Sequence, residues 1–513
     1  MICSHNRVLS YCIILLTLFL PEPTSILARN GDLSPLDFGL LQAENGMERY
    51  NCLYLTHCAA LEAGVNVTYK GIDSLDIEIA KDAKSIPLTD NTDFCGLVLR
   101  VRNNAKGHCI FELSQKTKEL HVEKQKIDSG IFSDVTDVAS GKFVLVLEDK
   151  TPWVKNRRGY QYGAIRKDII VLNNGIAKNR PTASYNNDIS IPKVTYFKAS
   201  RQQKKITNLT FVRDSGNTEK AYLLQLSNQC GVEISNIQCE TPKSDLFYDR
   251  MISLTDCSNM IFRNITISGT YSQIKKSGYG ISMNNVYNVA FYNLNAHANW
   301  GIFGNNNVNN VRLYHCDINR FDIHCYGRDI FFENCKFRNL YNQFSSILGT
   351  VLFERCEFFN FTPVLLEPSY NAYTAFDLKF KNCVIHACEG KDFLISGGEL
   401  KGKKTDERAE LRFQSYPNLY IDGLKIDMPE SIADYYIYRF RTNILNAPTV
   451  EGIREIKKVE FIKKAGNKLK EVDLRNQPIV FLELGGLSLL GAGIIFYACR
   501  NCIKSRINRT QCL

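Results

Sequence analysis

The chain has 513 residues, and its 44% hydrophobic content with only 14 prolines is typical of folded protein and excludes a largely disordered chain. The formal net charge is +10, but residues 1–29, 454–475 and 476–513 together carry +8 of it. The remaining body is close to neutral, which argues against a nucleic-acid-binding domain and predicts no nucleic-acid partner.

Residues 1–28 have the layout of a secretory signal peptide. Arg7 gives a basic start, an apolar run follows at residues 11–20, and Ala28 supplies a small residue before the expected cleavage point. An uncleaved membrane anchor is the alternative, but this apolar run is too short to span a bilayer comfortably. We therefore expect an exported protein.

The stretch from Met47 to Gly64 predicts an α-helix that ends in a glycine. Its apolar residues lie at helical spacing and form one face, which consists of Met47, Tyr50, Tyr54, Cys58 and Leu61. Strand-like sequence follows directly. We expect this face to cover the first coil of a β structure, where an exposed edge would invite aggregation.

The body of the chain repeats one short pattern of alternating apolar residues around an asparagine. The residues that follow the asparagine position, from Ile237 to Cys383, are 28, 29, 22, 19, 21 and 27 apart. A fixed motif at variable spacing predicts strands joined by loops of different length. Seven segments carry the motif: GVEISNIQC (231–239), NMIFRNITI (259–267), NVAFYNLNA (288–296), NVRLYHCDI (310–318), DIFFENCKF (329–337), TVLFERCEF (350–358) and DLKFKNCVI (377–385).

Each repeat alternates with period two, which predicts strands, and the phase slips by one residue at the asparagine. Asparagine tolerates the left-handed backbone conformation, so we expect a sharp bend there. Stacked coils would let the side-chain amides form a hydrogen-bonded ladder. The column contains Asn208, Asn236, Asn264, Asn293, Asn334 and Asn382, with His315 and Arg355 as exceptions.

Turns of 19 to 29 residues with short strands and an asparagine bend are typical of a parallel β-helix. On these repeats, residues 30–450 resemble the right-handed parallel β-helix, pectin-lyase-like superfamily, which includes pectate lyases, polygalacturonases and phage tailspikes. The resemblance implies an all-β, single-stranded right-handed parallel β-helix with an N-terminal helical cap. The WiDH and RxPxxR segments of pectate lyases and the NTD, DD, GHG and RIK set of polygalacturonases are absent, so no catalytic residue transfers.

Four of the 18 cysteines share one inward column of the repeats: Cys316, Cys335, Cys356 and Cys383. We interpret them as core residues, because a small polarizable side chain packs as a hydrophobe and stacked identical positions do not make a tetrahedral zinc site. The lone CxxC pair Cys499 and Cys502 is weak evidence for metal or redox chemistry. We predict no metal site and no cofactor, with calcium left open.

The run RFDIHCYGRD at residues 320–329 supplies the candidate site. Aligning the strand before each motif places Ile323 in the inward column of Ile302, so its neighbours Asp322 and His324 face solvent. A carboxylate and an imidazole beside small residues suit acid–base chemistry on a sugar polymer. Expected catalytic residues are Asp322, His324, Tyr326 and Arg328; expected substrate-binding residues are Ser282, His297, Asn299 and Phe303. The alternative is ordinary solvated surface.

The end of the chain changes in composition. We expect the β-helix domain to span residues 29–453, followed by a basic stem at 454–477, a transmembrane helix at 478–500 and a short basic tail at 501–513. A buried terminal β segment is the alternative for the apolar stretch, because Glu483 would be costly in lipid. The basic stem would lie near acidic lipid headgroups.

These features predict a secreted or surface-anchored β-helix protein that contacts an extracellular, acidic or neutral, polysaccharide. β-Elimination by a lyase would use a base, an acid and a group that neutralises the carboxylate of a uronate. Hydrolysis would use two carboxylates of the protein. A polysaccharide lyase or glycoside hydrolase is the first hypothesis, by analogy with the superfamily. A non-catalytic glycan-binding or adhesive β-helix and a structural surface protein are the alternatives.

Overall fold

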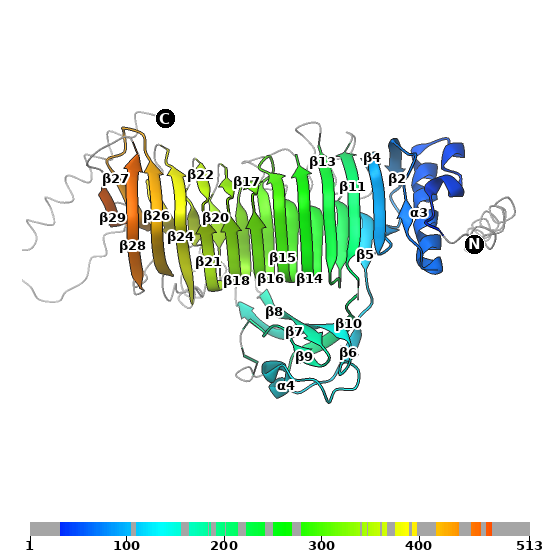
Figure 1. The fold of residues 1–513 in the computed structure, drawn as a ribbon, viewed down its shortest axis with the longest axis horizontal. Coiled ribbons are helices and arrows are strands. Elements are labelled where there is room, and N and C mark those ends of the chain that lie inside the picture. The colour runs from blue at the N-terminus through cyan, green and yellow to red at the C-terminus, as the bar shows by residue number, and fades with distance from the viewer. Residues whose placement is uncertain are drawn as a thin grey trace, which may run out of the picture. The chain divides into compact units, whose positions relative to one another are not determined.

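The computed structural model describes residues 31–473, apart from gaps at 104–108, 155–163, 183, 186–190, 201, 214–221, 242–249, 269–278, 339–340, 346, 360–361, 367–374, 389–391, 398–416, 441–452 and 463–467. Most of its strands belong to one continuous set of parallel pairings, in which each coil of the chain pairs with the next coil (Figure 1). The prediction of a parallel β-helix is therefore confirmed.

The first coils are formed by β1 (Val67–Thr68), β2 (Ser74–Ile79), β3 (Ile86–Pro87), β4 (Asn91–Asn103) and β5 (Cys109–Ser114). The stack resumes after an insertion with β11 (Lys204–Arg213), β12 (Tyr222–Ser227), β13 (Val232–Glu240), β14 (Arg250–Ile267), β15 (Tyr279–Ala296), β16 (Gly301–Tyr314), β17 (Asp317–Ile318), β18 (Phe321–Glu333), β19 (Lys336–Phe337) and β20 (Asn342–Phe344). It continues with β21 (Ile347–Glu354), β22 (Glu357–Phe359), β23 (Val364–Leu366), β24 (Ala375–His386), β25 (Phe393–Gly397), β26 (Asn418–Asp427), β27 (Asp434–Phe440), β28 (Arg454–Ile462) and β29 (Lys468–Asp473).

The asparagine bends occur where the repeats predict them. Asn264 has φ 53° and Asn293 has φ 56°, and the Asn293 amide nitrogen donates to the Asn264 side-chain oxygen at 3.1 Å. His315 and Arg355 adopt the same left-handed conformation. Residues without a short polar side chain lose about 1–2 kcal/mol in this conformation, which explains the choice of asparagine. Two further columns that the motif did not reveal bend in the same way: Asp256, Asn285 and Asn307, and Asn259, Asn288, Asn310 and Asp329.

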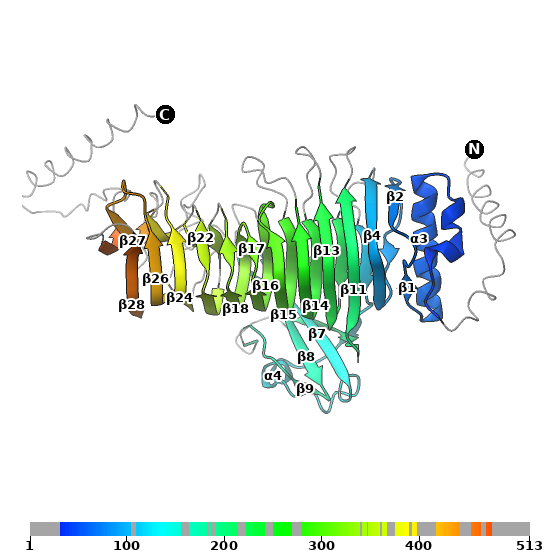
Figure 2. The ribbon, with the colours of Figure 1, turned by 45° about the horizontal axis from the view of Figure 1, so that its top comes forward.

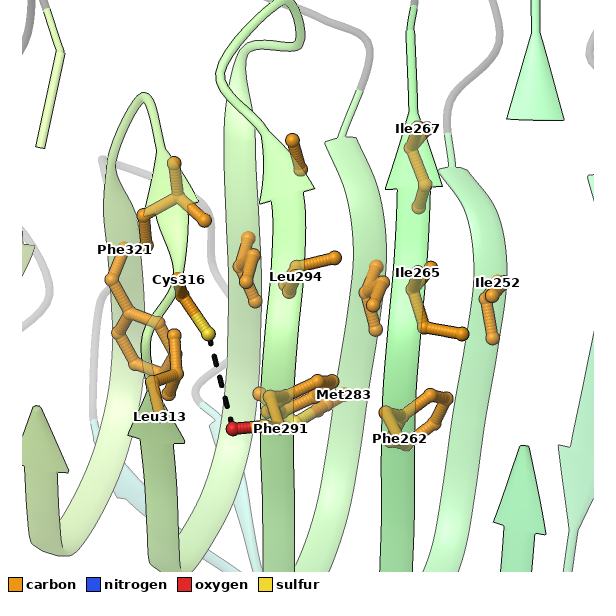
Figure 3. Close-up of a cluster of buried hydrophobic side chains, with 14 of the residues drawn as sticks. Ile252, Phe262, Ile265, Ile267, Met283, Phe291, Leu294, Leu313, Cys316 and Phe321 are labelled. Atoms are coloured by element: carbon orange, nitrogen blue, oxygen red, sulfur yellow. Dashed lines mark hydrogen bonds between the residues drawn. The ribbon is translucent and has the colours of Figure 1, made fainter. Parts of the chain in front are cut away.

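Stacked side chains of the same kind fill the interior of the β-helix (Figure 3). Phe262 lies flat against Phe291 with ring centroids 4.7 Å apart, and farther along Phe332 stacks on Phe353 at 4.8 Å. The predicted cysteine column is confirmed as core, because all four thiols are buried. Each thiol also donates to a backbone carbonyl beside the bend, as Cys316 does to Tyr314 and Phe291.

The N-terminal cap consists of two short 3-10 helices, Pro35–Phe38 and Leu40–Gln42, and of α3 (Gly46–Ala63). The helix packs on β2 as predicted, but with a different face from the one that spacing indicated. Met47 and Leu61 are 46% and 48% exposed. Tyr50 belongs to both faces, and its hydroxyl donates to the Lys84 carbonyl at 2.5 Å. The rotation brings His57 inside, where its ring hydrogen-bonds with the Tyr69 hydroxyl at 2.9 Å. The buried face is Tyr50, Leu53, Thr56, His57 and Ala60.

An inserted domain, which the repeats did not reveal, lies between β5 and β11. Its antiparallel sheet has the order β6-β10-β7-β8-β9, and it has its own buried core. Figure 2 shows β7, β8 and β9 as a small sheet apart from the stacked strands of the β-helix. A second cluster joins Val144, Val146 and Phe197 of this domain to Cys230 of the β-helix. The elements are β6 (Lys118–Leu120), α4 (Lys124–Ser129), β7 (Lys142–Val154), β8 (Ala164–Asn173), β9 (Ile176–Ala177) and β10 (Lys193–Lys198).

The stretch expected to form a basic stem begins with two further β-helix strands. β28 pairs with β26 and β29 pairs with β27, so the stack extends to Asp473. The expected signal peptide, transmembrane helix and tail lie outside the described residues. No helix of the described part is long and apolar enough to cross a membrane.

Candidate functional site

The pairing of β16 with β18 changes the alignment on which the candidate site rested. Ile302 pairs with Phe321, so Asp322 pairs with Phe303 and Ile323 pairs with Gly304. The prediction that Ile302 and Ile323 share a column is wrong by two residues. The coil advances only 19 residues, from Ile302 to Phe321. Asp322 thus occupies the outward position that the sequence alignment gave to His324.

Asp322 is fully buried rather than solvent-facing. Its carboxylate accepts hydrogen bonds from the Arg320 guanidinium at 2.6 and 2.5 Å and from the Tyr279 hydroxyl at 2.9 Å. The Trp300 indole donates to the same Tyr279 hydroxyl at 3.0 Å. The expectation of an exposed Asp322–His324 pair is therefore wrong.

Arg320 contacts several residues that the sequence did not single out. Its guanidinium lies 4.6 Å from the Trp300 ring centroid and 4.8 Å from that of Tyr341, and it donates to Gln343 at 3.1 Å. Gly301 makes room for it, since a Cβ there would lie 2.4 Å from the Arg320 side chain. We call Tyr279, Trp300, Arg320, Asp322 and Gln343 the sealed cluster.

Electrostatics supports a structural role for the sealed cluster. Burial raises the pKa of the Asp322 carboxyl, against the opposing pull of Arg320 and Tyr279. Removing one partner of a buried ion pair strongly destabilises the folded protein, because the other charge stays buried without a partner or water. The Asp322 carboxylate cannot touch a polymer in this arrangement, so the sealed cluster holds adjacent coils together.

The other expected site residues are dispersed. Ser282 is buried, and buried Asn299 donates to the Ile267 carbonyl at 2.5 Å, so both serve the fold. His324 is half-buried on β18, and Arg328 donates to the Thr182 carbonyl of the inserted domain at 2.9 Å. The side chains of Phe303 and Tyr326 are outside the described set. His297 is exposed, and its ring lies 3.9 Å from Asp317 on another surface.

That other surface carries a strip of charged and aromatic side chains on consecutive coils. We call this set the outer strip: Asp317, Arg338, Glu357, Phe359, His386 and Asp427. It follows the parallel strands β17, β19, β22, β24 and β26, each paired with the next. Strand alternation explains the strip, because the residues between its members point inward and are buried: Ile318, Phe337, Phe358, Ile385 and Ile426.

Three planar groups stack at the centre of the outer strip. The Phe359 ring lies against the His386 ring with centroids 4.6 Å apart and planes inclined by 11°, and the Arg338 guanidinium lies 4.6 Å from the Phe359 centroid. These side chains come from three successive coils. Their stacking fixes their positions before any ligand arrives, so little conformational entropy remains to be lost on binding.

Carboxylates flank this stack. Asp317 accepts two hydrogen bonds from Arg338 at 2.8 and 2.6 Å, and this pairing raises the pKa of Arg338. The His386 ring lies 3.4 Å from Asp427 and 3.9 Å from Glu357 through its two nitrogens. All these side chains are partly open to solvent, from 22% for Asp427 to 38% for Glu357.

The outer strip can bind hydroxyl-rich ligands and can move protons. Glu357 and Asp427 lie on strands that are two steps apart, about 9.6 Å, and Asp427 is also offset by two residues along its strand. The His386 ring lies between them, within 4 Å of each carboxylate. The described residues contain no group of three or more His, Cys, Asp or Glu arranged to hold a metal ion.

Sequence reasoning found only His297 near this surface. The signal for the rest was present, because Asp317, Glu357 and His386 directly flank inward residues of the repeated motif. Each of the later motifs carries or adjoins a polar residue beside an inward one. No single motif combines two of the acidic, basic or aromatic groups of the outer strip. The strip therefore becomes visible only when the coils are stacked.

Comparisons with known proteins fit the fold. No protein-family model matches the chain, and no curated protein matches its sequence. Among solved structures, the chain is similar to the tailspike protein gp49 from Pseudomonas phage LKA1, with 12% identity, a TM-score of 0.50 and coverage of 86% of this chain and 79% of that one. It is also similar to the gp54 tailspike of Acinetobacter baumannii bacteriophage AP22, solved with a capsular saccharide, with 11% identity, a TM-score of 0.52 and coverage of 86% and 77%. The chain has the right-handed parallel β-helix, pectin-lyase-like fold.

Proposed function

We propose that the protein is a polysaccharide-directed β-helix protein that binds its glycan along the outer strip. The observation that carries this proposal is the solvent-facing stack of Arg338, Phe359 and His386, with a carboxylate on each side. The structural likeness to a tailspike solved with a capsular saccharide supports the substrate class. An acidic or neutral extracellular polymer is the proposed ligand.

The chemistry of the strip suits sugar hydroxyls. Carboxylates accept hydrogen bonds from hydroxyl groups, and the N–H groups of Arg338 and His386 can donate to hydroxyl and ring oxygens. The stack repeats at the strand spacing of about 4.8 Å, so a chain lying across the coils meets a new polar edge at each step. Phe359 adds an apolar surface for the carbon-bound hydrogens of a sugar ring.

Glycan cleavage is a second candidate function, which one feature favours. His386 lies between Glu357 and Asp427 on an accessible surface, at 3.9 and 3.4 Å. A lyase would use such an imidazole to transfer a proton beside a uronate, and a hydrolase would use the two carboxylates on either side of the bond. The strip thus contains the groups for a polysaccharide lyase or glycoside hydrolase.

One experiment separates binding from cleavage. The full chain is incubated with a panel of acidic and neutral glycans, with and without calcium, and both bound glycan and new chain ends are measured. Binding without products supports the glycan-binding function, whereas products that disappear in His386→Ala support cleavage. Exposed His121 of the inserted domain provides the control His121→Ala, which should behave as wild type. Absence of both binding and products across the panel would overturn the proposal.

Export places the protein where such polymers occur. We propose, from the signal-like residues 1–28 and the apolar residues 478–500, that the chain is exported and held at a membrane by its C-terminal part. Cell fractionation of the full chain and of a chain ending at residue 477 tests this. Release of the shorter chain into the medium is expected, and equal retention of both forms would contradict the anchor.

A further inference from the structure

A pocket with a volume of about 430 Å³ lies where the inserted domain joins the β-helix. We call it the root pocket. It is far along the stack from the outer strip, since its walls come from the first coils and from the linker that leaves β10. Its size lies within the usual range for small-molecule sites.

Three parts of the chain build the root pocket. Leu61 comes from the end of α3, Leu88 and Glu112 come from the coil of β3 and β5, and Lys198 and Ser200 come from the return of the inserted domain. The entering and leaving strands are tied together beside the pocket, because the Gln115 amide donates to the Lys198 carbonyl at 3.1 Å. The opening is therefore a fixed part of the fold.

Three polar side chains of the wall, those of Asp90, Gln115 and Lys204, are already paired. Lys204 binds Asp90 at 2.7 Å and donates to Gln229 at 3.1 Å. Within the described part of the chain, the Glu112 carboxylate and the Lys198 ammonium form no hydrogen bond or ion pair of their own. The pocket therefore presents one carboxylate and one ammonium group to a ligand.

Apolar residues share the lining with the hydroxyl groups of Ser114 and Ser200. Leu61 is 48% exposed and Pro87 is half-buried, whereas Leu88 and Leu113 belong to the β-helix core and are almost fully buried. An aliphatic wall stabilises a hydrocarbon group by about 25 cal/mol for each Å² that is removed from water. Opposite charges beside such a wall are complementary to a molecule that carries both charges and a hydrocarbon body.

We propose that the root pocket binds a small zwitterion with a hydrocarbon body, the chemistry of an apolar α-amino acid. The ligand ammonium group pairs with Glu112, its carboxylate pairs with Lys198, and its side chain lies on Leu61 and Pro87. The proposal does not depend on the proposed glycan function, because the two sites share no residue.

Isothermal titration of the full chain with L-leucine tests the proposal. N-acetyl-L-leucine amide keeps the hydrocarbon body without either charge, and L-alanine keeps both charges with only a methyl side chain. We expect L-leucine to bind at least tenfold more tightly than either compound, since a hydrogen bond to a charged group and the buried hydrocarbon both contribute. No heat of binding with L-leucine, or equal affinity for the uncharged amide, would overturn the proposal.

Three variants locate the binding. Glu112→Gln and Lys198→Met should each weaken L-leucine binding about tenfold, and Ser114→Trp should abolish it by filling the pocket. Lys193→Met, at an exposed lysine on the same strand as Lys198, is the matched control and should bind as wild type. Wild-type affinity in Glu112→Gln or Ser114→Trp, with unchanged thermal unfolding, would contradict the proposed location.

Discussion

The sealed cluster and the outer strip contain the same kinds of side chain in opposite surroundings. Both pair an aspartate with an arginine beside aromatic rings, at 2.5 Å for Asp322 and Arg320 and at 2.6 Å for Asp317 and Arg338. Asp322 is fully buried, whereas Asp317 is 28% exposed. The comparison shows that side-chain chemistry alone does not distinguish a structural ion pair from a binding surface on this fold.

The contacts that surround each ion pair explain the difference in burial. The Asp322–Arg320 pair contacts Tyr279, Trp300 and Gln343 from neighbouring coils. The outer strip instead leaves the edges of its stacked groups in solvent. Its members can therefore exchange water for ligand hydroxyl groups, and the members of the sealed cluster cannot.

The largest expected effect is loss of the buried carboxylate. Asp322→Ala should lower the free energy of unfolding by about 3–5 kcal/mol, because it leaves the Arg320 charge buried without a partner. Asp317→Ala removes the equivalent partner on the outer strip and should cost no more than about 1 kcal/mol. Chemical denaturation measures both, and equal losses in the two variants would contradict the comparison.

A buried histidine should make the fold acid-sensitive. Burial lowers the pKa of His57 to about 3, so the folded state holds it neutral beside the Tyr69 hydroxyl at 2.9 Å. Its contribution to stability is present above the unfolded pKa of about 6.5 and is lost as pH falls toward 3, by about 3 kcal/mol at pH 4. Stability measured from pH 7 to pH 4 should fall less steeply in His57→Gln than in wild type.

Exposed His121 is the control for this slope. His121→Gln should leave the pH dependence of wild type unchanged. A His57→Gln variant that loses stability with acid as steeply as wild type would show that His57 is not the sensitive group.

The asparagine ladder should show that an exposed residue can be structural. Asn264 is exposed, yet Asn264→Ala should cost about 1–2 kcal/mol because alanine is strained at a φ of 53°. Asn264→Gly should cost less, since glycine adopts this conformation freely but loses the ladder hydrogen bonds to Asn236 and Asn293. Denaturation midpoints that rank alanine above glycine would contradict this explanation.

Loss of the Phe359 ring should affect stability little and glycan binding strongly. Phe359→Ala should lower the free energy of unfolding by only about 1 kcal/mol, because the ring is half-buried on the outside of the helix. It should weaken glycan binding about tenfold by removing the support of Arg338 and His386. Equilibrium binding to a glycan found in the panel measures this, with Asn264→Gly as a control that should bind normally.

The sequence predicts the fold well because the fold repeats. Period-two alternation, the Asn bends and the column from Cys316 to Cys383 each recur often enough to be read without coordinates. The inserted domain was not predicted, since its strands do not carry the repeated asparagine motif. Nor was the rotation of α3, which buries His57 against the Tyr69 hydroxyl.

The candidate site was predicted less well for a physical reason. The burial of Asp322 depends on the pairing of β16 with β18, and a shift of two residues moves a side chain into a different neighbourhood without changing the local pattern. Its partners Tyr279 and Gln343 lie 43 and 21 residues away along the chain. The local sequence therefore identified side chains capable of acid–base chemistry at Asp322 and His324. It did not indicate which of them is exposed to solvent.

Carboxyl labelling with mass spectrometry, performed with and without bound glycan, tests the central claim most directly. The account predicts that Glu357 and Asp427 are labelled in the free protein and protected by glycan, while Asp322 is unlabelled in both states. Labelling of Asp322 in the folded protein, or glycan protection that leaves Glu357 and Asp427 unchanged, would contradict the assignment of the outer strip as the glycan site.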